Sequence, residues 1–124
     1  MRDERSLAAE RGVQAEQAAC DHLRARGLTL HSRNYRCRSG EIDLIMRDGE
    51  TLVFVEVRYR SSNRFGGAAA SVDAAKQQKL IRTAQTFLGE QRLHHMACRF
   101  DVVTVTPHEG AMQVEWIPNA IEAD

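Results

Sequence analysis

Acidic side chains gather in a predicted β-hairpin in the first half of the chain. Two apolar segments, Ile42–Met46 and Leu52–Val57, flank Asp48 and Gly49, a dipeptide typical of a two-residue hairpin turn. Strand side chains alternate between the faces of a sheet, so this turn gathers one wholly apolar set: Ile42, Leu44, Met46, Val53, Val55 and Val57. The opposite face then carries four charged residues: Glu41, Asp43, Glu56 and Arg58.

The chemistry that these charged residues suggest is metal binding. In this register Glu41 faces Glu56 and Asp43 faces Phe54, and like charges that face each other on a sheet are destabilising. Three carboxylates on one face therefore call for a compensating cation, and Mg²⁺ or Mn²⁺ takes oxygen ligands. The alternative is that the acids lie in water at a sheet edge, or pair with Arg58 and the arginines of the preceding segment.

A further acid, Glu16, lies in the first predicted helix, which covers residues 6–26 and ends at a glycine. Glu16 falls within the apolar stripe formed by Val13, Cys20 and Leu23, where an unpaired carboxylate is costly to bury. If this helix packs near the open end of the hairpin, Glu16 completes a set of metal ligands. A hydrogen bond to a neighbouring arginine at the edge of the stripe is the alternative.

The elements that must position these acids follow from the same patterns. A strand could begin at Leu28–Leu30, the arginine-rich stretch to Gly40 is extended chain or loop, and Ser61–Ala70 is a glycine-rich loop. The chain then continues with a helix capped by Ser71 and reaching about Gly89, strands at Phe100–Val105 and Gln113–Ile117, and a fraying end at Asn119–Asp124. The inward face of the second helix comprises Val72, Leu80, Ala84, Phe87 and Leu88.

This order predicts one α/β domain at residues 1–118, with a central mixed sheet flanked by helices, and a flexible tail at residues 119–124. Of the 124 residues, 43% are hydrophobic and 27% charged, which is typical of a globular chain. No apolar run approaches the length of a membrane span. Three widely spaced cysteines argue against a disulfide framework and favour a reducing cytoplasm.

The net charge is zero, from 17 basic and 17 acidic residues, which alone lowers the odds of a nucleic-acid partner. The distribution is uneven, however, because no Lys or Arg follows Arg99. One basic run comprises Arg24, Arg26, Arg33, Arg36 and Arg38, and a second group comprises Arg58, Arg60, Arg64, Lys76, Lys79 and Arg82. Basic patches could therefore be hidden by the zero net charge, and we expect Arg36, Arg38, Arg60 and Lys76 to contact nucleic acid.

Four further observations concern single residues. Lys76 and Gln77 precede the apolar Leu80 by one turn, so they could point towards the sheet and reach a phosphate. Asp101 shares strand parity with Val103, and it could accept hydrogen bonds from an arginine or a backbone amide. The aromatic residues Trp116, Tyr35 and Tyr59 could stack on bases, although core packing is the commoner use. His94, His95 and Cys98 cluster, but no second ligand pair has zinc-like spacing.

The segments Gly40–Ile45 and Val53–Arg58 resemble the YraN-type family of uncharacterised bacterial proteins. That family is similar in turn to the PD-(D/E)XK nuclease superfamily, which includes archaeal Holliday-junction resolvases. The resemblance covers roughly residues 10–106, including Asn34-Tyr35-Arg36, the Lys76–Leu88 helix and Arg99–Val102. It implies a restriction-endonuclease-like fold and metal-dependent cleavage of phosphodiester bonds in DNA, branched or damaged DNA included. A homodimer is compatible with it, since resolvases pair across a symmetric junction.

The resemblance also implies a role for each matching residue. Asp43 takes the place of the superfamily's metal-binding aspartate, Glu56 that of the acid in E-x-K, and Glu16 matches the acid of the first helix in the resolvases. A Mg²⁺ ion held by these acids would polarise the phosphate and lower the pKa of a bound water.

Arg58 departs from the motif, because it stands where E-x-K has lysine. An arginine stays protonated and cannot be a general base, although it can bind phosphate and stabilise developing negative charge. Three functions therefore remain open: a nuclease, a catalytically weakened nucleic-acid-binding module, and a protein-interaction adaptor.

Overall fold

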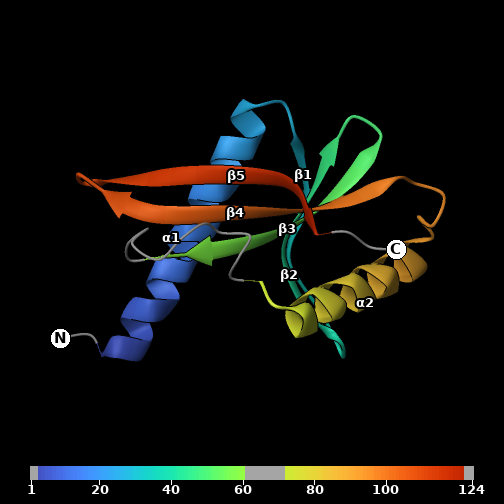
Figure 1. The fold of residues 1–124 in the computed structure, drawn as a ribbon, viewed down its shortest axis with the longest axis horizontal. Helices are drawn as coiled ribbons and strands as arrows, with labels where there is room; N and C mark the ends of the chain where they lie inside the picture. The colour runs from blue at the N-terminus through green and yellow to red at the C-terminus, as the bar shows by residue number, and fades with distance from the viewer. Residues whose placement is uncertain (1–2, 61–71, 122–124) are drawn as a thin grey trace.

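A computed structural model describes residues 3–60 and 72–121. These form seven elements: α1 (Glu4–Ala25), β1 (Thr29–Cys37), β2 (Gly40–Asp48), β3 (Thr51–Tyr59), α2 (Ala74–Gln91), β4 (Cys98–His108) and β5 (Ala111–Ile121) (Figure 1). The predicted α/β architecture is confirmed. The predicted loop at Ser61–Ala70 and the predicted N-cap Ser71 lie outside the described residues.

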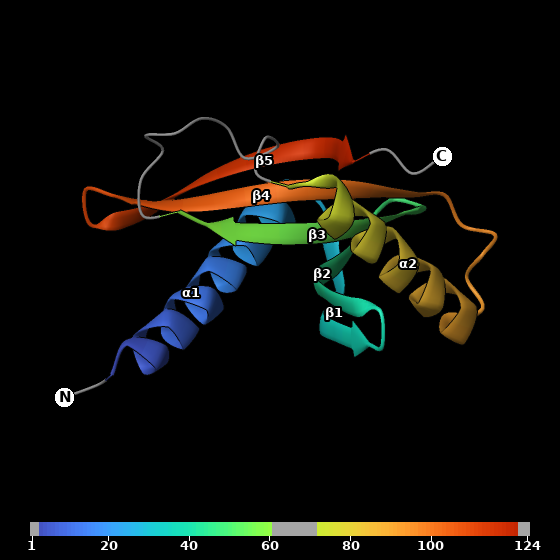
Figure 2. The ribbon, with the colours of Figure 1, turned by 60° about the horizontal axis from the view of Figure 1, so that its bottom comes forward.

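The five strands form one mixed sheet in the order β1-β2-β3-β4-β5. Neighbouring strands are antiparallel except β3 and β4, which are parallel. Because parallel neighbours need a long crossover, the chain returns from the end of β3 to the start of β4 by way of α2. The two helices cover different faces of the sheet (Figure 2). The central strand β3 is therefore buried from both sides.

Each helix encloses its own apolar core. Under α1 the buried cluster comprises Ala15, Ala19, Cys20, Leu23, Leu28, Leu44, Met46, Val53, Val55, Val103 and Val105. Under α2 it comprises Ile42, Ile45, Leu52, Phe54, Val72, Leu80, Ala84, Phe87, Leu88, Phe100, Val102 and Ile121. The predicted inward face of the second helix is confirmed. In the described part of the chain, neither helix has the length and apolar character needed to cross a membrane.

The β2–β3 hairpin turns one residue later than expected. Asp48 pairs with Thr51, so the two turn residues are Gly49 and Glu50, and Gly49 supplies the positive φ of 61°. Moving a two-residue turn by one position moves the pairing by two, so every side chain keeps its face. The expected partners are therefore wrong, while the change of register alone leaves the expected faces unchanged.

The corrected register brings the two principal acids together. Leu44 pairs with Val55, and Asp43 and Glu56 are the next residues of the two strands, where the charge of Glu56 acts on Asp43 and raises its pKa. The sequence had placed Asp43 opposite Phe54 and Glu41 opposite Glu56.

The apolar face of the hairpin is broken at one point. Leu44 lies in the core under α1, whereas Ile42 lies in the core under α2, so the predicted six-residue apolar face is wrong at Ile42. On the neighbouring strand Asn34 lies between the pairs that β1 forms with Leu44 and Ile42, and hence opposite Asp43. Its φ of 51° is a left-handed conformation that asparagine tolerates. The alternation is interrupted here, beside the acids.

The first helix begins earlier and packs differently from the prediction. Asp3 is its N-cap and accepts a hydrogen bond from the Ser6 amide, and Gly27 follows its end with a φ of 99°. Val13, expected inside, is 68% exposed. The reason is that only the C-terminal half of α1 lies over the sheet, where Ala15 and Ala19 are buried.

The second helix is capped by Asp73, not by the expected Ser71. The Asp73 Oδ1 accepts a hydrogen bond from the Lys76 amide at 2.8 Å. At the other end the helix passes Gly89 and continues to Gln91, because Arg92 takes the left-handed cap conformation at φ 56°. The expected C-terminal glycine is therefore inside the helix.

The last strand does not end at Pro118, as the sequence had suggested. It continues to Ile121, which pairs with Phe100 and is only 3% exposed. The fraying end expected from Asn119 is thus wrong for residues 119–121. The cause is a buried anchor, since the Asn119 amide donates to Asp101 at 2.8 Å.

Asp101 is fully buried and accepts hydrogen bonds from three groups. Besides the Asn119 amide, these are Trp116 Nε1 at 2.9 Å and Arg99 Nε at 3.1 Å. The expectation that Asp101 accepts from an arginine or a backbone amide is confirmed. Arg99 also pairs with Asp48 at the hairpin turn, at 3.0 Å. This network ties β4 to β5 and to the β2–β3 turn.

We expect Asp101→Ala to lower the free energy of unfolding by about 3–5 kcal/mol, since it leaves buried donors and a charge without their acceptor. Asp48→Ala removes the other carboxylate that pairs with Arg99. Because the Asp48 side chain is 46% exposed, this change should lower the free energy of unfolding by less than about 1 kcal/mol. Urea unfolding of both variants measures the difference. Equal losses would contradict the role assigned to Asp101.

Candidate active site

Asp43 is a carboxylate held largely out of water at the centre of the sheet. Its Oδ2 accepts a hydrogen bond from the backbone amide of Val57, on the neighbouring strand, at 2.8 Å. Burial, together with the charges of Glu56, Glu16 and Glu41, raises its pKa to about 7 against the opposing effect of the Val57 hydrogen bond. Near neutral pH this side chain is therefore close to half protonated.

Glu56 is the second buried acid, 7% exposed. Burial raises its pKa, while two cations oppose that rise. Its Oε1 lies 3.4 Å from Lys76 Nζ and 3.9 Å from Arg58 Nη1. One carboxylate thus faces an ammonium from α2 and a guanidinium from its own strand.

Glu16 approaches this pair from α1. Burial raises its pKa, a hydrogen bond with the Asn34 side chain lowers it, and Glu41 and Arg33 act on it with opposite signs. Glu16 in turn raises the pKa of Asp43, so the first helix does bring an acid towards the hairpin. Asn34 was missed by sequence reasoning. A polar residue that tolerates a left-handed backbone, in the middle of a predicted extended segment, is the signal that could have found it.

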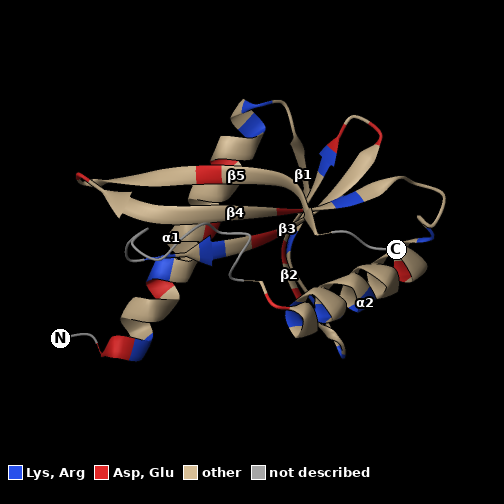
Figure 3. Ribbon diagram, in the orientation of Figure 1, with Lys and Arg blue, Asp and Glu red and all other residues tan. Residues whose placement is uncertain are grey.

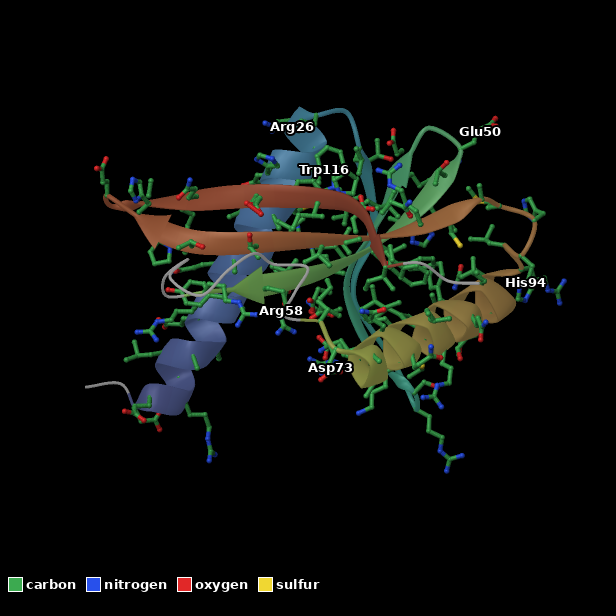
Figure 4. All side chains as sticks on the ribbon, viewed as in Figure 1. Arg26, Glu50, Arg58, Asp73, His94 and Trp116 are labelled. Atoms are coloured by element: carbon green, nitrogen blue, oxygen red, sulfur yellow. The ribbon has the colours of Figure 1, made fainter. Side chains whose placement is uncertain are left out.

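Arg58 and Lys76 meet at Glu56 from different elements. Figure 4 shows Arg58 on β3 on the same side of the molecule as Asp73, which begins α2. Because Asp73 fixes the first turn of α2 through the Lys76 amide, it also fixes where the lysine stem starts. The neighbouring Gln77, expected to reach a phosphate, instead donates to the Val72 carbonyl at 2.8 Å.

The other predicted nucleic-acid contacts lie at the surface around the acids. Arg36 pairs with Glu41 at 3.2 Å, and Arg38 is exposed at the end of the β1–β2 turn. Arg60 follows β3 and is held by its backbone amide, which donates to the Val105 carbonyl at 2.9 Å. The structure thus brings Arg36 to Glu41, on the acidic side of the hairpin.

The aromatic side chains considered for base stacking are engaged elsewhere. The Tyr35 hydroxyl donates to Glu90 and its ring packs edge-on against Phe87. Trp116 donates to Asp101 and packs against the core under α1, as does Tyr59.

The donor set suits a hard divalent cation bound through few protein ligands. Within residues 3–60 and 72–121, no three His, Cys, Asp or Glu side chains are grouped closely enough to hold a metal ion, so a formed triad with Glu16 is absent there. Asp43, half-buried, and Glu56, buried, remain as two neighbouring carboxylates. Mg²⁺ is commonly bound by one or two carboxylates together with waters and substrate phosphates. The lysine at Glu56 already supplies one positive charge at the place where a cation would be stabilised.

The fold and this acid pair define a small α/β protein with two neighbouring carboxylates on strands β2 and β3 of a mixed sheet. The model of the uncharacterised protein family UPF0102 matches residues 15–105. The chain belongs to this family, the YraN family that the hairpin motifs resemble.

Close relatives cover nearly the whole chain. A UPF0102 protein of Methylococcus capsulatus is 58% identical over 112 residues, which are 90% of this chain and 90% of that protein. Another from Nitrosococcus oceani is 52% identical over 118 residues, covering 93% and 94%. A third from Pseudomonas aeruginosa is 47% identical over 123 residues, covering 97% and 98%. These names give the family and state no activity.

The raised pKa of Asp43 makes a prediction for metal-free buffer. Because the folded protein keeps a proton that the unfolded chain releases, the stability of the wild type should fall as pH rises from about 3.8 to about 7 and then level off. Asp43→Asn keeps an acceptor for Val57 but cannot ionise, so its melting temperature should rise relative to wild type across this window. Thermal melts at several pH values measure this. Glu50→Gln, an exposed acid in the same hairpin, is the control, and a parallel response would contradict the prediction.

Proposed function

We propose that this protein is a metal-dependent phosphodiesterase acting on DNA, with Asp43 and Glu56 as ligands of Mg²⁺ or Mn²⁺. The observation that carries the proposal is the proximity of two carboxylates on adjacent strands, Glu56 buried and Asp43 half-buried with its pKa raised to about 7. Burying two like charges side by side is costly unless a cation balances them. A bound divalent ion would supply Lewis-acid polarisation of a phosphate and a water of lowered pKa.

The protein's own groups divide the remaining work. Lys76 and Arg58 present positive charge beside Glu56, where a phosphate oxygen gains negative charge during cleavage. The Val57 amide fixes the orientation of Asp43, so the carboxylate needs no rearrangement when a ligand arrives. Glu16 stays a proposed third contributor through its effect on Asp43. Arg58 stands where E-x-K has its lysine, and Lys76 supplies a lysine to the same acid, Glu56, from helix α2.

A second function, binding of nucleic acid without cleavage, is favoured by a specific observation. Two cations, Lys76 and Arg58, lie within 4 Å of Glu56, so its charge is already balanced without a metal ion. If those ion pairs persist when a divalent ion is offered, the site binds phosphate through Lys76 and Arg58 and does not hydrolyse it. Metal affinity separates the two functions.

Cleavage of a DNA panel tests the proposed activity. Single-stranded, duplex, flapped and four-way DNA are incubated with Mg²⁺, Mn²⁺ or EDTA. We expect cleavage by the wild type that depends on the metal and falls at least about 100-fold in Asp43→Ala, the scale of losing one electrostatic stabiliser. Arg58→Lys should retain activity, because it keeps the charge. Activity that appears only in Arg58→Lys would instead favour the binding module.

Metal affinity can be measured without any substrate. At pH 8, addition of Mg²⁺ or Mn²⁺ should raise the melting temperature of the wild type in proportion to its binding free energy. The shift should vanish in Asp43→Asn and persist in Glu50→Gln. A wild type that does not respond to either metal would argue for the binding function.

A further inference from the structure

A positively charged surface lies beside the acid pair, where α2 meets the β1–β2 turn. We call it the turn–helix surface, and its cations are Arg36, Arg38, Lys76, Lys79 and Arg82. From Ala74 to Gly89 the second helix contains no acidic residue. Figure 3 shows the basic colour on the N-terminal half of α2 and on the turn next to it, with acidic colour on the strands behind.

The turn is fixed on α2 by a close contact. A Cβ atom built on Gly40 would lie 3.1 Å from Thr83 Oγ1 and 4.0 Å from Lys79 Cβ, and its φ is 152°. The Thr83 hydroxyl donates to the Lys79 carbonyl at 2.7 Å, which fixes it within the helix. Glycine therefore lets the turn that contains Arg38 approach the helix closely at Thr83 and Lys79.

The same helix stripe continues to the acid pair. Lys76, Lys79 and Thr83 follow one another at spacings of three and four residues, so they lie on one side of α2. Lys76 contacts Glu56 at one end of this stripe, and the stem of Lys79 lies near Gly40 at its middle. The stripe thus extends from Glu56 to the β1–β2 turn.

These cations remain accessible to a ligand. The side chain of Arg36 is 72% exposed and its pair with Glu41 is a surface pair, which contributes little and can be exchanged. The Lys76 side chain is 44% exposed although it contacts Glu56. Lys79 and Arg82 are both exposed, and Arg82 Nε donates to the Gln78 carbonyl of its own helix at 3.4 Å.

The chemistry of the surface indicates phosphates rather than bases. Binding of single strands uses exposed aromatic rings on which bases stack, and the exposed large hydrophobic residues of the described chain are Leu7 and Val13, neither of them aromatic and both on α1. A row of cations without stacking rings matches a regular phosphate backbone instead.

We infer that the turn–helix surface binds the phosphate backbone of double-helical DNA and leads it to Asp43 and Glu56. The inference rests on the proposed function for its ligand, but it concerns binding and not cleavage. It assigns phosphate contacts to Lys79 and Arg82, and a positioning role to Gly40.

Binding in EDTA tests this surface independently of cleavage. The anisotropy of a labelled duplex is measured against salt concentration for the wild type, for Lys79→Gln/Arg82→Gln, and for Arg11→Gln/Arg24→Gln, a control that removes two exposed arginines of α1. Losing two phosphate contacts should lower the slope of log K against log salt by about 1.8, from about 0.9 for each contact. The control should keep the wild-type slope.

A third variant tests the positioning role. Gly40→Ala changes no charge but forces the turn away from Thr83, so it should weaken duplex binding while circular dichroism reports an intact fold. If Gly40→Ala does not fold, the charge variants still decide the inference.

The outcomes separate the two proposals. A wild type that binds the duplex with a steep salt slope, but cuts no DNA with either metal, overturns the phosphodiesterase and leaves this inference standing. A wild type that cuts while Lys79→Gln/Arg82→Gln binds like the control overturns this inference alone. Tighter binding to a single strand, or to an RNA duplex of the same sequence, also overturns it.

Discussion

The register of the β2–β3 hairpin is the constraint on which the candidate site depends. Because Gly49 and Glu50 form the turn, Asp43 lies opposite Glu56 and accepts a hydrogen bond from the amide that follows it. A slip of one residue would send one acid to the other face of the sheet and bury it in a core. The two apolar cores hold the hairpin from both sides, so the same burial that stabilises the fold fixes the geometry of the acids.

That geometry has an electrostatic cost, which the surrounding structure reduces only in part. Glu56 has Lys76 and Arg58 beside it, and the N-terminal end of α2, with its partial positive charge, lies at the same place. Asp43 receives one backbone hydrogen bond, while every charge that acts on it strongly is negative. The two acids therefore differ in kind. Glu56 stays balanced, and Asp43 is the group whose charge state depends on what else enters the site.

The sequence predicted the architecture and, except at Ile42, the faces of the hairpin, because alternation and turn signals are local. It failed where tertiary contacts decide. Val13 is exposed because the sheet does not reach the first half of α1. Strand β5 continues beyond Pro118 because the Asn119 amide donates a hydrogen bond to Asp101. The sequence alone could not show that Lys76 contacts Glu56, because 20 positions and a crossover separate the two residues.

The zero net charge of the chain conceals two adjacent regions of opposite sign. The acid pair lies at the inner end of a basic surface, so a polyanion is attracted along the turn–helix surface and repelled at its end. A phosphate can approach Asp43 only when that repulsion is removed, by a proton, by the neighbouring lysine or by a cation shared between the acids. Under the proposed function, different residues attract the ligand and act on it. The exposed cations of α2 would bind the phosphate backbone of the nucleic acid, while Asp43 and Glu56 would decide which charged groups can approach the site. Under the proposed function, binding of the polymer and neutralisation of the pair would be energetically coupled, and each would favour the other through the same short stretch of α2.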